Sequence, residues 1–363
     1  MRAKLFLILG VFALSACGSG TGPVPLAGTN ALQSLNRTTP GTQSVLAPLK
    51  IVTVGSTVDP VTGDVNPYGL AIAQSTWGSI HTGDIVDCDF NDKANVQGTG
   101  TAMVLLNSKP GSKPRHFFSS GAIKGCDAIA LSPDDTVWPT DYSANNAPII
   151  SSSGKLLTTE KNAVWHGPWG IAFSSNQSVP AFYATNAKTG ELVRIDLTHG
   201  TFTVIASGFP VNGGKPGSIL APSGLNYVAS GDLLYVVDGD NNALYAIDNV
   251  STVQDHGITV DGLTFSGPNA ADAHVVFHGK PLNGPISSAL LPGGNIALGN
   301  TLDPQGKNLI VELTPAGKVV AVKNVDTGAP GAIFGMAATG TTPQNAKLYF
   351  NDDNDNTVKV LTP

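Results

Sequence analysis

Short apolar runs alternate with turns rich in Gly, Pro, Asp and Asn from about residue 45 to the end of the chain. The pattern repeats as a unit. A Pro or small residue and a Gly lead into one apolar strand, a second apolar strand ends in Asp or Asn, and a third follows a polar turn. Short strands separated by turn residues are typical of all-β domains, and repetition indicates an array of equivalent units. We therefore predict one all-β domain over residues 45–363.

Six copies of the unit can be aligned along the chain. Their first strands open near Asn66, Gly125, Gly167, Ala221, Gly284 and Ala332, and their second strands end at Asp87, Asp141, Asn186, Asp238, Asn300 and Asp352. Asp and Asn suit the turns that follow because their side chains bond nearby backbone amides and tolerate left-handed conformations. This structural role explains most of these polar residues.

The fourth copy, residues 222–248 (PSGLNYVASGDLLYVVDGDNNALYAID), is similar to an NHL repeat, the unit from which six-bladed β-propellers are built. The chain also resembles, more distantly, the gluconolactonase and strictosidine-synthase propellers. The resemblance covers residues 45–363 and implies six four-stranded blades. The last copy has three strands, and a strand predicted at 48–54 precedes the first copy. We expect this N-terminal strand to join the last blade and close the ring, which protects the sheet edges.

The first residues carry the pattern of an export signal. Arg2 and Lys4 precede an apolar run, Leu5–Ala13, that is shorter than the roughly 20 residues a membrane helix needs. The run ends in the sequence LSAC at 14–17, which resembles the lipobox of bacterial lipoproteins. The resemblance implies removal of residues 1–16 as a signal peptide and attachment of diacylglyceryl and palmitate lipid to Cys17. An ordinary secretory signal with an incidental cysteine is the alternative.

Residues 17–44 are small and polar, with several Pro and Gly and no sustained period, which predicts a flexible tether between the lipid and the domain. No later segment has the long uncharged apolar stretch of a membrane helix, so lipid is the expected membrane attachment. Gly18 differs from the aspartate that retains lipoproteins in the inner membrane. The resemblance thus implies an exported protein, lipid-anchored in the bacterial cell envelope at the outer membrane.

Charge and motifs narrow the functional classes. Charged residues make up 13% of the chain, about half the usual share, and the net charge is −6. The Lys and Arg residues do not cluster as a phosphate-binding groove requires, which excludes nucleic acid as an expected partner. The sequence contains no HExxH, GxSxG, GxxxxGK[ST] or CxxC motif, so the corresponding hydrolase, nucleotide and thiol chemistries have no support.

Two cysteines remain once Cys17 is assigned to lipid. Cys88 and Cys126 would lie in an oxidising compartment, where disulfides persist, and we favour a disulfide between them. Two buried free thiols are the alternative, because free cysteine behaves as a small apolar residue in protein cores.

Oxygen-rich turns raise the question of a bound divalent cation such as Ca²⁺, the one candidate cofactor. Three segments have Asp-x-Asp/Asn-x-Asn spacing, at 87–91, 238–242 and 352–356, but none has the Gly and Glu of a calcium-binding EF-hand loop. A single metal in the central channel is the second possibility, implied by the lactonase-like propellers. The candidate ligands for it are Asp127, Asn226, Asp238 and Asn300.

Aromatic residues near the first-strand openings are candidates for ligand contact on one face of the ring. The segment Trp165-His166-Gly167-Pro168-Trp169 brings two indoles and an imidazole to one loop, where they could bind a sugar, a peptide or an apolar group. The candidate rim consists of Tyr68, Trp138, Trp165, His166, Trp169 and Phe334. Packing of the aromatic rings between blades is the competing interpretation.

These observations favour a lipid-anchored module of the cell envelope that binds a protein, peptide or sugar on one face, or serves as a scaffold. The alternative is a metal-dependent, lactonase-like hydrolase in which a channel metal polarises a lactone carbonyl and activates water. A purely structural envelope protein is a third interpretation. Because one fold hosts many functions, the site must decide between them.

Overall fold

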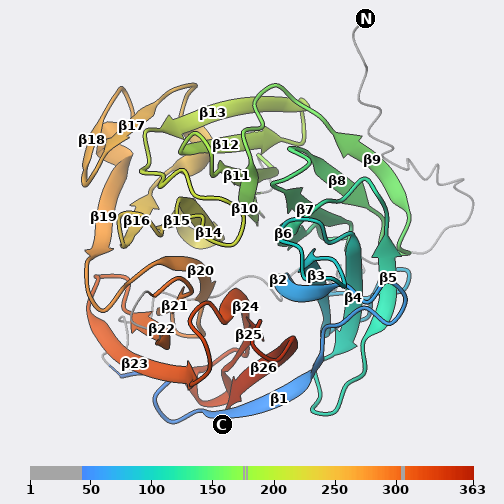
Figure 1. Cartoon of the computed structure of the whole chain (residues 1–363). Helices are drawn as coiled ribbons and strands as arrows, with labels where there is room; N and C mark the ends of the chain where they lie inside the picture. Colours follow the sequence, from blue (N-terminus) through green and yellow to red (C-terminus); the bar gives the residue numbers. More distant parts are fainter. Residues whose placement is uncertain (1–42, 175, 177–178, 304–306) are drawn as a thin grey trace, which may run out of the picture.

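Six β-sheets surround a central channel in the computed structural model, as Figure 1 shows. The structure describes residues 43–363, apart from 175, 177–178 and 304–306. The all-β, six-bladed propeller predicted from the repeats is confirmed. The predicted signal peptide, Cys17 and nearly all of the predicted tether lie outside the described residues.

Each blade is a four-stranded antiparallel sheet, and the innermost strand is the first named for each. Blade 1 contains β2 (Val65–Ile72), β3 (Asp84–Asn91), β4 (Ala102–Asn107) and β5 (Arg115–Ser119). Blade 2 contains β6 (Cys126–Leu131), β7 (Val137–Asp141), β8 (Ala147–Ile150) and β9 (Leu156–Glu160). Blade 3 contains β10 (Pro168–Ser174), β11 (Ala181–Asn186), β12 (Glu191–Asp196) and β13 (Thr201–Ser207).

The other three blades follow the same order around the ring. Blade 4 contains β14 (Pro222–Val228), β15 (Leu233–Asp238), β16 (Ala243–Ile247) and β19 (Ala273–His278). Blade 5 contains β20 (Pro285–Leu290), β21 (Ile296–Asn300), β22 (Asn308–Leu313) and β23 (Val319–Asp326). Blade 6 contains β24 (Ile333–Thr339), β25 (Lys347–Asp352), β26 (Thr357–Thr362) and β1 (Lys50–Ser56).

Helical structure in the described residues is limited to four single 3₁₀ turns, η1 (Ala229–Gly231), η2 (Val250–Thr252), η3 (Ala270–Asp272) and η4 (Pro343–Asn345). None of these helices has the length and apolar character needed to cross a membrane.

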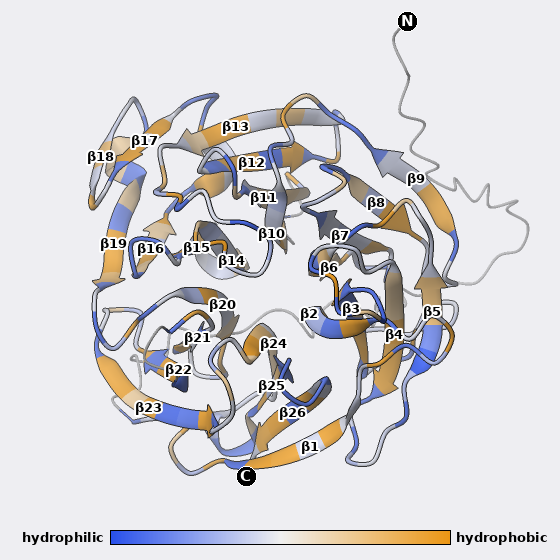
Figure 2. Ribbon diagram, viewed as in Figure 1, coloured by the Kyte–Doolittle hydropathy of each residue, from blue (hydrophilic) through white to orange (hydrophobic). Residues whose placement is uncertain are grey.

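The hydrophobic core is divided into layers between neighbouring blades. Both faces of each sheet pack against another blade, so alternate residues along a strand belong to different layers. In β3, for example, Ile85 packs toward blade 6 whereas Val86 packs toward blade 2. Figure 2 shows hydrophobic residues along the strands of every blade. Burial of apolar area in all of these layers is the main favourable contribution to folding.

The outer strand of blade 6 comes from the other end of the chain. Strand β1 pairs antiparallel with β26, with Ile51 opposite Leu361 and Val52 opposite Val360. The residues just before β1 also contact the ring, because Glu312 of blade 5 accepts hydrogen bonds from the backbone N–H groups of Val45 and Leu46. The two ends of the described chain are therefore held together by one sheet.

Two details of the strands differ from the sequence interpretation. The second strand of blade 1 was expected to end at Asp87, but β3 continues to Asn91, and Asp89 takes the position that Asp141 has in blade 2. The segment between β16 and β19 also forms an unpredicted hairpin, β17 (Ile258–Asp261) and β18 (Thr264–Ser266), which extends the sheet of blade 3 beside β13. This insertion accounts for the wide spacing of that repeat.

A disulfide joins Cys88 of β3 to Cys126 of β6. Both cysteines are completely buried in the layer between blades 1 and 2, where the bond crosslinks adjacent blades.

Candidate functional site

The candidate site is a cavity in the central channel, lined by the six inner strands. Each blade contributes three consecutive residues, so the lining consists of three stacked rings. The mouth ring is Tyr68, Asp127, Trp169, Ser223, Ile286 and Phe334; the middle ring is Gly69, Ala128, Gly170, Gly224, Ser287 and Gly335; the inner ring is Leu70, Ile129, Ile171, Leu225, Ser288 and Met336. Asn226 completes the lining.

Ladder register explains why these residues meet. In every blade one residue of the inner strand pairs with the Asp or Asn near the end of the second strand, such as Pro168 with Asn186 or Pro222 with Asp238. The mouth-ring residue comes directly after it in the sequence. A register shift in each inner strand follows that pair. An irregularity of this kind re-aims the neighbouring side chains, here toward the axis of the ring.

Small residues in the middle ring provide the space. Four of the six are glycine, and a Cβ on Gly170 would lie only 1.7 Å from the carbonyl oxygen of Ser223 in the next blade. The inner strands thus approach one another closely at this level, and the cavity volume is about 120 Å³. At about 30 Å³ for each water molecule, this space holds about four waters or one compact organic group.

Aromatic side chains enclose the mouth of the cavity. The ring of Tyr68 lies 4.1 Å from that of Phe334 and 5.6 Å from that of Trp169, centroid to centroid. Tyr142 contacts the edge of Trp169 and holds a lysine ammonium, Lys188, 4.5 Å from its own ring centre. These contacts between four blades fix the aromatic wall of the cavity, since aromatic pairs in tilted and edge-to-face arrangements are stabilising.

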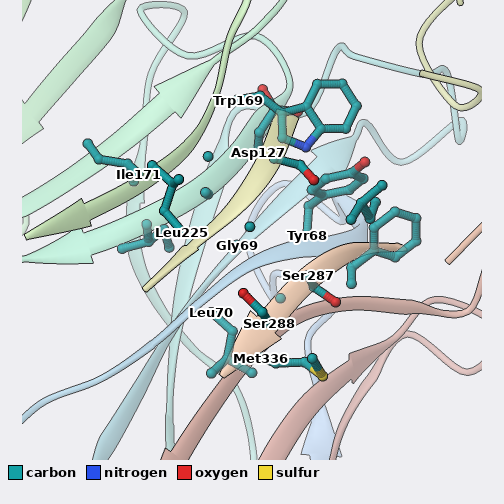
Figure 3. Close-up of a pocket in the computed structure, with 18 of the residues that line it drawn as sticks. Tyr68, Gly69, Leu70, Asp127, Trp169, Ile171, Leu225, Ser287, Ser288 and Met336 are labelled. Carbon is teal, nitrogen blue, oxygen red and sulfur yellow. The ribbon is translucent and has the colours of Figure 1, made fainter. Parts of the chain in front are cut away.

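Asp127 provides the one carboxyl group of the cavity lining, as Figure 3 shows beside Tyr68 and Trp169. The side chain is buried, and its Oδ2 accepts a hydrogen bond of 2.8 Å from the backbone N–H of Tyr142. Its Oδ1 has no hydrogen-bond partner among the described residues. Burial raises the pKa of Asp127 well above its usual range, which favours the protonated form of the group.

Blade 5, which lies opposite blade 2 in the ring, brings further polar groups to the cavity. Ser288 accepts a hydrogen bond from the Asn226 amide, whereas the hydroxyl of Ser287 is buried and has no partner among the described residues. Buried polar groups in proteins are nearly always hydrogen-bonded, so each unpaired one needs an explanation. Asp127 and Ser287 give the cavity two unsatisfied polar groups, in a lining that combines aromatic and aliphatic side chains with the polar side chains of Ser223, Asn226 and Ser288.

The structure separates the predicted rim residues into two groups. Tyr68, Trp169 and Phe334 line the cavity. Trp138 and Trp165 pack between blades 2 and 3, where Trp138 stacks on Phe182, and they do not reach the cavity. The competing interpretation of packing between blades therefore holds for these two residues.

His166 also lies away from the cavity. Its ring is about half exposed, and its Nδ1 lies 3.2 Å from a carboxylate oxygen of Glu191.

The four candidate metal ligands do not converge on one point. Asp127 and Asn226 line the cavity, but Asp238 and Asn300 lie at the ends of β15 and β21, where their side chains accept hydrogen bonds from the backbone N–H groups of Asn241 and Asn283. Within the described part of the chain, no three His, Cys, Asp or Glu side chains are gathered to hold a metal ion. The channel thus offers one carboxyl and neutral oxygens.

The serine residues of blade 5 were not predicted. A signal was present, since Ile286-Ser287-Ser288 follows a Gly-Pro opening in the same way that Trp169-Gly170-Ile171 does. Aligning five of the openings by their Pro or Cys position, and the sixth by Ile333, would have identified the three rings.

A second, more open pocket of about 670 Å³ lies on blade 2, between the loop that leads into β6 and the turn that joins β7 to β8. Its lining is polar and includes Lys124, Lys161 and Asn145. The backbone N–H of Lys124 donates to Asp141, which connects this pocket to the turn beside Tyr142. The face that carries the mouth ring thus has a second concave surface.

Comparison with known proteins supports the fold and goes no further. No family model and no curated protein matches the sequence. Among solved structures, a gluconolactonase from Xanthomonas campestris is similar over 87% of this chain and 90% of its own, with a TM-score of 0.59 and 11% identity. Virginiamycin B lyase from Staphylococcus aureus is similar over 87% of this chain and 99% of its own, with a TM-score of 0.52 and 15% identity.

The nidogen chain of a nidogen/laminin complex is also similar, over 78% of this chain and 87% of the solved chain, with a TM-score of 0.53 and 13% identity. Two of these proteins are named as enzymes, and the third comes from a complex of two proteins. At such identities the likeness establishes the propeller fold alone.

Proposed function

We propose that this chain is a lipid-anchored binding module of the cell envelope, and that it holds a small neutral ligand in the central channel cavity. The observation that carries the proposal is the pairing of an aromatic wall with one buried carboxyl whose Oδ1 lacks a partner among the described residues. Apolar pockets with a few placed polar groups are the usual form of small-molecule sites. The aromatic wall would pack against the ligand, and Asp127 would fix its orientation.

The protonation state of Asp127 indicates the ligand chemistry. A protonated carboxyl can donate one hydrogen bond, and its Oδ2 already accepts from Tyr142. The free side of the group therefore suits an acceptor such as a carbonyl, lactone or ether oxygen. A hydroxyl on the ligand would in turn pair with Ser287 across the cavity.

A lactonase-like activity is less well supported by this lining. Asp127 and Asn226 are the candidate ligands that reach the cavity, and Asp238 and Asn300 already serve local turns. Catalytic metal ions are typically held by three protein ligands, and two of the four candidates reach the cavity. We therefore propose binding rather than turnover as the function of the cavity.

Ligand-observed NMR on the mature protein tests the proposal. The probes are small neutral carbonyl compounds, from acetamide to δ-gluconolactone, and the variant is Asp127→Leu, which keeps the branching of the side chain but removes the hydrogen-bonding group. We expect at least one probe to bind wild type and to lose at least tenfold in affinity in the variant, since a ligand acceptor would be left unpaired. Asp238→Asn, outside the cavity, is the control and should bind normally.

The same samples separate the two functions. Hydrolysis of δ-gluconolactone above the spontaneous rate, abolished by Asp127→Leu, would favour the enzyme instead. Binding that survives Asp127→Leu would place the ligand elsewhere on the molecule.

A further inference from the structure

Blade 1 differs from the other five blades at the end of its second strand. In those five, the equivalent Asp or Asn accepts a hydrogen bond from a backbone N–H group: Asp141 from Lys124 and Ala144, Asn186 from His166, Asp238 from Asn241, Asn300 from Asn283, and Asp352 from Asn354. In blade 1 this residue is Asp89, and neither of its carboxylate oxygens has a partner among the described residues. Its side chain is completely buried.

The loop that enters blade 1 explains the missing donors. It brings Asp59 and Asp64 toward Asp89, and both are occupied elsewhere. Asp59 lies 2.7 Å from the imidazole of His116, and Asp64 accepts the backbone N–H of Thr101 at 2.7 Å. Burial raises the pKa of Asp89, and the neighbouring carboxylates raise it further. Asp89 therefore lies near the carboxyl groups of Asp59 and Asp64, whereas its counterparts in the other blades accept hydrogen bonds from backbone N–H groups.

A second carboxylate lies on the same face of β3. Asp87 is two residues from Asp89, which places both side chains on one side of the strand. Asp87 pairs with Leu70, the inner-ring residue of its blade. In the other blades the residues that pair with the inner-ring residue are Pro139, Ala184, Val236, Leu298 and Phe350. Asp87 thus replaces an apolar residue in a buried layer. It is fully buried, neither of its carboxylate oxygens has a hydrogen bond of ordinary geometry among the described residues, and the group nearest to it is the amide of Asn351.

Blade 6 contributes a neutral oxygen to the same seam. Asn351 of β25 is fully buried, and its amide Nδ2 donates a long hydrogen bond of 3.5 Å to the carbonyl of Gly69 in blade 1. The amide is close enough to Asp87 to counteract part of the rise in its pKa. The Oδ1 of Asn351 has no partner among the described residues. We call Asp87, Asp89 and Asn351 the seam cluster.

Neighbouring residues at the same seam have further unpaired oxygens. Thr57 and Asn66 donate their backbone N–H groups to Asn356 of blade 6, at 2.9 and 2.7 Å, and the side-chain oxygens of both lack partners among the described residues. The hydroxyl of Thr357 is also buried and unpaired within that part of the chain.

An isolated buried carboxylate costs far more than a surface one, and two together repel each other. A bound cation would offset both the cost of burying the carboxylates and the repulsion between them. Carboxylate, amide and hydroxyl oxygens without nitrogen or sulfur form the ligand set of a hard divalent cation, and flexible sets that mix charged and neutral oxygens suit Ca²⁺.

We propose that the seam between blades 1 and 6 binds a divalent cation of the calcium class through the carboxylates of Asp87 and Asp89 and the Oδ1 of Asn351. The site is separate from the channel cavity, since none of the three residues lines it. The cation would crosslink the first and last blades of the ring, at the point where the chain closes. Binding to the native state alone would stabilise the protein as the ion concentration rises.

The experiment uses the mature protein after removal of metals with a chelator. Calorimetric titration with Ca²⁺ should show one site per chain, and millimolar Ca²⁺ should raise the melting temperature by several degrees. The test variant is Asp87→Asn/Asp89→Asn, which keeps the shape and removes the charge. We expect it to lose stoichiometric binding and the thermal shift, and to melt at or above the temperature of metal-free wild type because the buried repulsion is gone.

Two control variants make the outcome specific. Asp238→Asn changes the residue of blade 4 that is equivalent to Asp89, and Asp127→Asn changes the channel carboxyl; both should keep the Ca²⁺ response. If the double asparagine variant fails to fold, Asp87→Leu, which restores the residue of blade 5, replaces it. Absence of binding and shift in wild type with Ca²⁺, Mg²⁺ and Mn²⁺ would overturn the proposal. A Ca²⁺ response that survives in the double asparagine variant would also overturn it. The same holds for a response that is lost in Asp127→Asn or in Asp238→Asn.

Discussion

At the scale of single residues, polar groups at strand ends explain much of the geometry. Asn186 and Asn300 accept hydrogen bonds from the loop that enters their own blade, whereas the sequence predicted bonds within the turn that follows, as Asp238 makes with Asn241. What the sequence could not show is which groups remain unpaired. Asp89 looks like its counterparts in sequence, and its difference arises from the long-range approach of Asp59 and Asp64. Such contacts depend on tertiary structure and not on local pattern.

Buried carboxyl groups make a prediction about pH. Burial raises the pKa of Asp238 and Asp141 to about 7, above the value of about 3.9 in an unfolded chain. Between these values the folded state holds protons that the unfolded state has released. The stabilising contribution of these groups is thus largest at low pH and is lost as the pH rises from about 4 to 7.

For Asp238, the change is on the order of 2–4 kcal/mol across that range. Urea unfolding at several pH values, with wild type and Asp238→Asn, measures it. The variant should show a flatter dependence of unfolding free energy on pH, because Asn cannot titrate and can still accept the N–H of Asn241. An identical pH dependence in both proteins would contradict the assignment.

At the scale of elements, repeats in the sequence predicted six blades because each copy has the same strand and turn chemistry. The prediction missed the β17–β18 hairpin, whose residues fit no copy, and it ended β3 too early. It also could not distinguish the two tryptophans of one loop: Trp169 lines the cavity and Trp165 packs between blades. A register irregularity between Pro168 and Ile171 determines which way Trp169 points, and such irregularities leave no sequence signature of their own.

The pairing of β1 with β26 leads to a second prediction. Val52 and Val54 of β1 pack into the layer between blades 6 and 1, and β1 covers the edge of β26. A chain that begins after Ser56 should melt at a markedly lower temperature and aggregate, because it exposes an unpaired strand edge and apolar surface. A chain that begins at Gln43 is the control and should melt like the mature protein. Equal melting temperatures for the two truncated chains would show that β1 contributes nothing to the ring.

At the scale of the whole molecule, a rigid propeller carrying one small channel cavity suits a binding module held at a membrane by lipid. The proposed anchor is at Cys17, which lies outside the described residues. The Cys17→Ser variant should lose incorporation of labelled palmitate and move from the membrane fraction to the soluble exported fraction. Fractionation of cells with an antibody against the domain measures this. Membrane association that persists without Cys17 would contradict the lipid anchor.

The central claim is that Asp127, whose pKa is raised by burial, faces a ligand in the channel. The most direct test is a ¹³C NMR titration of the Asp127 carboxyl in the mature protein, assigned by comparison with Asp127→Asn. The account predicts a carboxyl with a pKa well above the usual range, and a signal that shifts when a bound carbonyl probe accepts its hydrogen bond. An Asp127 that ionises near pH 4 and does not respond to any probe would contradict the claim.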